Sequence, residues 1–232
     1  MAEFLKNSAV WGVLLSVAGY GLGALLQKKT GKAWCNPLLL GILFVMLTLS
    51  VCRIPYEDYA ESAAPIRYLL LPATVSLAVP LYENLSKLRG NVGAVLGGIL
   101  AGVLTSVGSI LLMAWLLRLN QAQAATLITN SVTTAIGMDV AQSLGGMAPL
   151  ASAVIILTGI TGNLTAQAVC RLCRITDPIA RGVGIGTASH AIGTARAFEM
   201  GELEGAMSSL AVAIAGIATA VLAPILIRLV PV

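Results

Sequence analysis

Two long runs without a charged residue limit what this chain can fold into more than any other feature of its sequence. Residues 92–117 form a run of 26 residues, and residues 206–227 form another of 22. A helix needs about 20 mainly apolar residues to cross the hydrocarbon core of a bilayer. Charged residues make up only 10% of the chain, against about 25% in soluble domains. The sequence therefore predicts an all-α, polytopic membrane protein.

The apolar pattern predicts about six to eight membrane segments in a single membrane domain over residues 1–232. Complete spans are expected at residues 8–26, 38–52, 92–117, 148–170 and 206–229, with loops at the acidic stretches 53–65 and 201–205 (GELEG). Asn36-Pro37 and Asp177-Pro178 are expected to begin helices, because proline is tolerated in the first turn. The segment 68–85 contains Pro72 and Pro80, and each proline removes a helical hydrogen bond, so we expect a broken span there. Residues 68–117 and 124–172 show weak sequence similarity to each other, which suggests an internal repeat. Paired interruptions of this kind in two halves of a chain are typical of transporter binding sites.

The basic loops constrain the topology, because lysine and arginine gather on the cytoplasmic side of a membrane. If residues 124–144 cross the membrane completely, the loop with Arg171, Arg174 and Arg181 falls on the outside. A re-entrant or half-helical segment keeps that loop inside, and we favour it. The same question, span or re-entrant segment, is open for residues 182–200. The basic clusters are small and flank membrane segments, so we expect no nucleic acid partner.

Residues 182–200, GVGIGTASHAIGTARAFEM, carry the densest group of hydrogen-bonding side chains and the only histidine. On a continuous helix Thr187, His190 and Thr194 share one face, and Ser189 and Arg196 share the opposite face. Ionisable groups at membrane depth are costly and usually functional, so these five side chains are candidates for binding a solute. Two alternatives are open: His190 is bonded to a neighbouring span, or Arg196 ends the segment and reaches the interface.

Residues 124–144 form the second unusual segment. Its candidate binding side chains are Asn130, Ser131, Thr133 and Thr134. We expect the helix to break at Gly137. Asp139 is the only charge between Arg118 and Arg171, which makes it either a site for a coupled proton or cation or an interfacial residue.

Catalysis fits the sequence poorly. Ser189 and His190 are adjacent, so their side chains diverge on a helix, and no carboxylate is placed to orient the imidazole. The glycines of residues 182–186 lack the Lys-Ser/Thr of a phosphate-binding loop. The C-x-x-C of Cys170 and Cys173 has no second pair of metal ligands. We therefore expect no enzyme activity, no cofactor and no metal.

Several motifs resemble one known family. The run GTASHAIGTA (186–195), followed by EGAMSSLA (204–211), is similar to the LrgB/CidB family of bacterial inner-membrane proteins. The segments NPLL (36–39), PATVSLAVPLY (72–82) and SVTT (131–134) extend the resemblance from about residue 36 to the C-terminus. The family pattern reads close to PKSVTTPIA where this chain has TNSVTTAIG, so any role of that lysine in relatives does not carry over.

The resemblance implies a multi-pass protein of the bacterial inner (cytoplasmic) membrane, with two expected functions. One is transport of a small monocarboxylate anion such as glycolate, glycerate or pyruvate, together with a small LrgA/CidA-like membrane partner. Hydroxyl, imidazole and guanidinium donors beside broken helices suit a carboxylate, and we favour this function. The alternative is an antiholin-like regulator of murein hydrolase activity and autolysis that acts through protein contacts without transport. Glycine-rich spans also make a homodimer plausible.

Overall fold

The computed structural model describes residues 10–30, 36–69, 72, 75–76, 78–83 and 90–229. All regular structure in these ranges is helical, as the sequence predicts. The chain divides into two compact units, Met1–Ser76 and Leu77–Val232. Much of the broken span expected at residues 68–85 lies outside the described residues, so the internal repeat and the single membrane domain stay predictions.

The first unit is built on two helices that cross closely, α2 (Trp11–Thr30) and α3 (Pro37–Cys52). A Cβ on Gly23 would lie 2.8 Å from the Pro37 carbonyl oxygen, so a small residue allows this approach. The predicted start of α3 is confirmed. Asn36 Oδ1 accepts hydrogen bonds from the N–H groups of Leu38 (2.9 Å) and Leu39 (3.2 Å).

The acidic segment after α3, which the sequence predicts as a loop, is largely helical. It forms α4 (Tyr56–Ser62) and α5 (Ala64–Tyr68). Glu57 and Asp58 lie in the first turn of α4, where carboxylates stabilise the positive end of the helix dipole.

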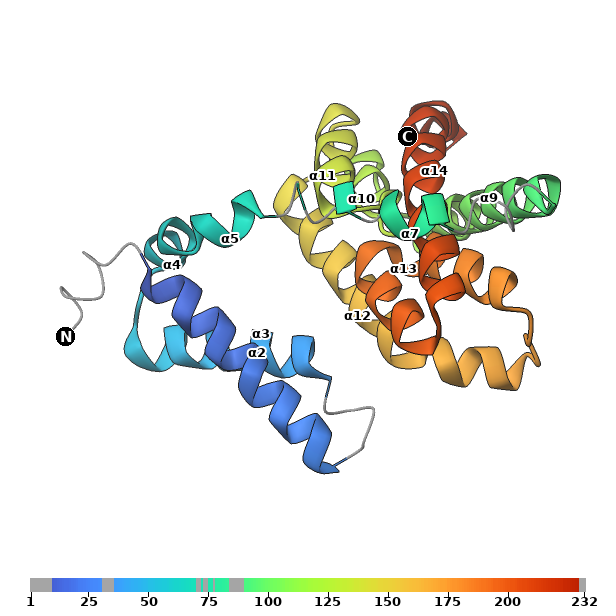
Figure 1. Cartoon of the computed structure of the whole chain (residues 1–232). Helices are drawn as coiled ribbons and strands as arrows, with labels where there is room; N and C mark the ends of the chain where they lie inside the picture. The colour runs from blue at the N-terminus through green and yellow to red at the C-terminus, as the bar shows by residue number, and fades with distance from the viewer. Residues whose placement is uncertain are drawn as a thin grey trace. The chain divides into compact units, whose positions relative to one another are not determined.

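The second unit contains the longest apolar helices and the broken ones (Figure 1). Its helices are α7 (Ala78–Glu83), α9 (Val92–Leu116), α10 (Gln121–Leu127), α11 (Thr134–Ser143), α12 (Ala148–Leu172), α13 (Pro178–Met200) and α14 (Glu202–Leu226), with a 3-10 turn at Ile227–Leu229. Among the described residues α9, α12 and Glu202–Leu229 are long and apolar enough to cross a membrane, and α3 is a shorter apolar helix. The prediction of a loop at GELEG (201–205) is wrong. Helix α14 already begins at Glu202, and only Gly201 separates it from α13.

The core of this unit lies between α9 and α14. It contains Val95, Ile99, Val103 and Val107 from α9, with Met207, Ala211 and Ala215 from α14. The outward surfaces of the long helices are also apolar, as Leu104, Leu157 and Ile217 show by their exposure. Helices that are apolar on both their inner and outer faces fit a bilayer rather than water.

Three apolar helices end in the same way, with an arginine in the left-handed conformation. These residues are Arg53 (φ 50°), Arg118 (φ 50°) and Arg174 (φ 53°). The N–H of the next residue then donates to the carbonyl five positions earlier, at 2.9, 2.9 and 2.8 Å. This closure satisfies the last carbonyls of each helix and places a cation at the negative end of its dipole.

Candidate functional site

Helices α10 and α11 run in opposite directions and form a short hairpin whose tip is residues 128–133. Thr126 in α10 contacts the residues that follow α11, because the Met147 N–H donates to Thr126 Oγ1 at 2.9 Å. Three residues later, the Thr129 carbonyl oxygen faces the first half of α11, where a Cβ on Gly137 would lie 3.3 Å from it. The hairpin connects the C-terminus of α9 to the N-terminus of α12. A re-entrant segment has this shape, and its re-entry into the membrane stays a prediction.

The break in this segment is not at Gly137, as the sequence predicts. Gly137 lies inside α11, buried against the side chain of Ile155 in α12. The helix is interrupted before Thr134, where asparagine, serine and threonine follow one another. Such side chains compete with the helix for backbone hydrogen bonds, so the break falls at the polar residues.

Helix α13 also reverses, and its turning point is His190, whose backbone is not helical (φ 42°, ψ −145°). Gly186 packs on the backbone of Ser208 in α14, and Thr194 Oγ1 lies 2.8 Å from Ser208 Oγ. In a straight helix Gly186 and Thr194 would be about 12 Å apart, so they reach one serine only because the chain turns back. Residues 178–189 and 191–200 therefore form a second hairpin in place of one continuous helix, and re-entry of residues 182–200 into the membrane stays a prediction.

Helix α12 holds the tip of the second hairpin at its midpoint. His190 Nε2–H donates to the Ile155 carbonyl oxygen at 2.9 Å, and Asn163 Nδ2 donates to the Ile192 carbonyl oxygen at 2.8 Å. A Cβ on Gly159 would lie 2.7 Å from His190 Cε1. Backbone conformations of this kind in a residue other than glycine cost about 1–3 kcal/mol and persist only where the surroundings enforce them.

The two tips meet beside α9 and line an open cavity of about 350 Å³. The first hairpin contributes Asn130 and Ser131, the second contributes Gly184, Thr187 and Ala188, and α9 contributes Gly98, Gly102, Thr105, Ser106 and Ser109. Ser106 Oγ lies 3.1 Å from Asn130 Oδ1 and 3.0 Å from Ser131 Oγ. A Cβ on Gly102 would lie 3.2 Å from Thr187 Cβ, so this glycine admits the second hairpin. The hairpins enter from opposite ends of α12, and both reach Ile155.

Three of the predicted binding residues, Asn130, Ser131 and Thr187, thus line one cavity, but the predicted helical face does not exist. Thr187 lies before the reversal and Thr194 after it. His190 is 2% exposed and bonded to α12, which is the contact expected of a packed histidine. Thr194 Oγ1 donates to the His190 carbonyl oxygen at 3.0 Å, and this hydrogen bond stabilises the chain reversal at His190. The binding role of these residues stays a prediction.

The other predicted residues lie elsewhere. Ser189 packs against Gly162 of α12 and lines a different cavity, of about 400 Å³, with Thr158 and Thr161. Thr133 precedes α11 as its N-cap residue, and Thr134 begins that helix, with both half-buried. Asp139 is exposed on α11, and its role as a coupling-ion site stays a prediction.

Arg196 lies at the end of the second hairpin, away from the tip. It pairs with Glu199, and its Nη2 donates to Gln167 Oε1 at 2.7 Å. Arg196 thus lies near the end of α13, which continues to Met200, and the alternative in which it reaches the membrane interface stays a prediction. Its expected place on one face with Ser189 is wrong, because the two residues lie on opposite sides of the turn.

Sequence reasoning missed the contribution of α9. Ser106 joins the first tip, and Gly98 and Gly102 form the wall opposite Thr187. A signal was present, because Thr105, Ser106 and three nearby glycines interrupt an otherwise aliphatic span. Glycines in a span indicate close packing equally well, so sequence alone could not separate packing from a cavity wall.

Comparison of the sequence with known proteins identifies relatives of this chain. The chain is 30% identical over 224 residues to the antiholin-like protein LrgB of Bacillus subtilis (strain 168), covering 96% of this chain and 97% of the relative. It is 32% identical over 215 residues to the antiholin-like protein LrgB of Bacillus mycoides (strain KBAB4), covering 92% and 94%. The protein of that name from Bacillus cereus (strain B4264) matches to the same extent. No solved structure matches. The LrgB-like family matches residues 16–229, and the chain belongs to this family of membrane proteins.

Proposed function

We propose that this chain moves a small monocarboxylate of the glycolate, glycerate or pyruvate type across the bacterial cytoplasmic membrane, together with a small LrgA/CidA-like partner. One observation carries the proposal: two hairpins enter from opposite ends of α12, and their tips line an open cavity whose largely apolar wall carries hydroxyl and amide groups. Interrupted helices that meet near the bilayer midplane are the usual construction of binding sites in secondary transporters.

The chemistry of the cavity suits an anion of this size. Its described lining residues supply hydroxyl and amide groups and contain no carboxylate. Helix α11 begins at the first tip, and Thr133 makes no side-chain capping bond there. Free N–H groups at a helix N-terminus, together with the dipole, favour a carboxylate. In this proposal the substrate is held by hydroxyl groups and amide dipoles, with Arg196 outside the site.

A second candidate function rests on a different observation. The relatives are named antiholin-like, and these names favour regulation of murein hydrolase activity and autolysis more directly than they favour transport. In that function the hairpins and their buried hydrogen bonds would form a protein-contact scaffold, and the cavity would bind no substrate.

Uptake into proteoliposomes tests the first candidate. The full chain, with and without its LrgA/CidA-like partner, is reconstituted and given labelled pyruvate, glycolate or glycerate. The informative variant is Thr187→Val, because valine keeps the shape of the side chain and removes its hydroxyl. The matched control is Thr48→Val in α3, since Thr48 Oγ1 donates to the Phe44 carbonyl oxygen as Thr187 Oγ1 donates to that of Val183.

We expect Thr187→Val to lower uptake about tenfold and Thr48→Val to leave uptake unchanged. In this proposal the Thr187 hydroxyl turns from the Val183 carbonyl oxygen to the substrate, and a hydrogen bond to a charged group is worth about 1.5 kcal/mol. Absence of uptake of all three acids with the partner present would remove the transport proposal. Autolysis of cells that carry Thr187→Val then separates the candidates. Normal control of autolysis by a variant that has lost transport would support the regulatory function on its own.

A further inference from the structure

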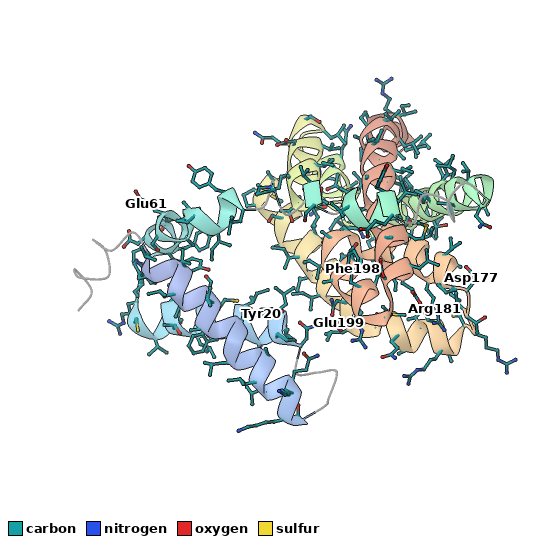
Figure 2. All side chains as sticks on the ribbon, viewed as in Figure 1. Tyr20, Glu61, Asp177, Arg181, Phe198 and Glu199 are labelled. Atoms are coloured by element: carbon teal, nitrogen blue, oxygen red, sulfur yellow. The ribbon has the colours of Figure 1, made fainter. Side chains whose placement is uncertain are left out.

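The base of the second hairpin forms a half-open cavity of about 220 Å³, which shares no lining residue with the cavity at the tips. Its polar lining consists of Arg171 and Gln167 from the end of α12, Arg181 from the start of α13, and Arg196 and Glu199 from its end. Arg181 and Glu199 are labelled in Figure 2. In a straight helix Arg181 and Arg196 would be about 22 Å apart, so the reversal at His190 creates this cluster.

The arginines are partly immobilised by their neighbours. Arg181 Nε donates to the Ile175 carbonyl oxygen at 2.8 Å, and its Nη1 lies 3.8 Å from Glu204 Oε1. Arg196 is held by Glu199 and Gln167. A guanidinium group has five N–H donors, and these contacts use only some of them. Arg171 is exposed at the mouth.

The charge balance of the cavity is positive. Three guanidinium groups line it, and the carboxylates near them are those of Glu199 and Glu204. Three positive and two negative charges leave +1 in this cluster. Guanidinium groups that are fixed in place and keep free donors match the geometry of carboxylate and phosphate oxygens.

We propose that this cavity is a second anion site, which binds one small oxyanion, a carboxylate or a phosphate. A water molecule occupies about 30 Å³ of liquid, so the space holds a phosphate group or a three-carbon acid. Arg196 is six residues from the tip, which corresponds to about 9 Å along the helix, so this site is distinct from the cavity at the tips. The site lies at the charged end of α12, where a soluble anion and a lipid phosphate both have access. The inference does not depend on transport.

Thermal stability of the purified full chain in a neutral detergent tests binding of a soluble anion. Sodium phosphate and sodium pyruvate are titrated at constant ionic strength against sodium chloride, because a ligand that binds the folded state raises the melting temperature. The variant is Arg171→Gln, and the matched control is Arg174→Gln, which removes an exposed arginine three residues away that does not line the cavity. We expect the apparent affinity to fall about tenfold in Arg171→Gln, since one charge-assisted hydrogen bond is lost, and to be unchanged in Arg174→Gln.

A second arm identifies a lipid source. The wild type and both variants are purified from nanodiscs that contain phosphatidylcholine alone or with phosphatidylglycerol, and retained phosphatidylglycerol is counted per protein by mass spectrometry. Retention that depends on Arg171 but not on Arg174 assigns the site to a lipid phosphate, whereas dependence only in the first arm assigns it to a soluble anion. An adventitious surface-charge effect would weaken binding equally in both variants. That outcome, or no binding in either arm, overturns the proposal.

Discussion

The packing of the second hairpin on α14 can be tested at one glycine. A Cβ on Gly186 would lie 2.9 Å from both the Cα and the carbonyl carbon of Ser208, and closer still to its oxygen. Favourable carbon contacts need about 3.5–4.0 Å, so Gly186→Ala requires the two backbones to separate by about 0.6–1.1 Å. Gly184 is the matched control, because nothing lies within 4 Å of its added Cβ.

The expected magnitudes follow from these two environments. Overpacking costs about 1–3 kcal/mol, and the upper value applies because the obstacle is backbone rather than a flexible side chain. Replacing a helical glycine by alanine raises the free energy of unfolding by about 1 kcal/mol. The free energy of unfolding should therefore fall by about 2 kcal/mol in Gly186→Ala and rise by about 1 kcal/mol in Gly184→Ala. In a chain of this size 1 kcal/mol corresponds to about 2–4 °C in melting temperature.

Thermal unfolding in detergent, followed by tryptophan fluorescence, gives the readout. We expect the melting temperature to fall by about 4–8 °C for Gly186→Ala and to rise by about 2–4 °C for Gly184→Ala. Equal shifts for the two variants would refute the close approach of α13 to Ser208 and, with it, the reversal of the hairpin.

Two further predictions test the ends and the reversal of α13. Asp177→Ala removes the acceptor that caps the Ala180 N–H at 2.8 Å, so we expect the melting temperature to fall by about 2–4 °C for a loss of about 1 kcal/mol. A shift as small as that of Asp139→Ala on the exposed side of α11 would argue against the cap. The double variant Ile185→Cys/Ala197→Cys, in a chain without other cysteines, should form a disulfide on mild oxidation, because these residues pack in one small cluster. A straight helix would separate them by about 18 Å, beyond the reach of a disulfide, so failure to cross-link would contradict the reversal.

Part of the candidate site was predictable from sequence. Ser131 and Thr187 belong to two polar interruptions in an apolar chain, and polar groups at membrane depth need partners, which marks both as candidate site residues. The role of Ser106 was not predictable, because one hydroxyl in a long span bonds equally well to its own helix. Only the packing of α9 against the first tip directs it to Asn130 and Ser131.

The sequence by itself determined the membrane class, the long spans and the helix starts at Asn36 and Asp177. Each depends on local information, namely the length of a charge-free run or a side chain that caps the residues next to it. The reversal at His190, and the separation of Arg196 from Thr187 that follows from it, were decided by tertiary structure. Helical periodicity assumes a continuous helix, whereas the backbone angles of His190 are held by Ile155 and Asn163, which lie 35 and 27 residues earlier in the chain. Contacts that override the local preference of one residue do not change the periodic pattern of the sequence. The reversal at His190 is therefore seen only in the folded chain.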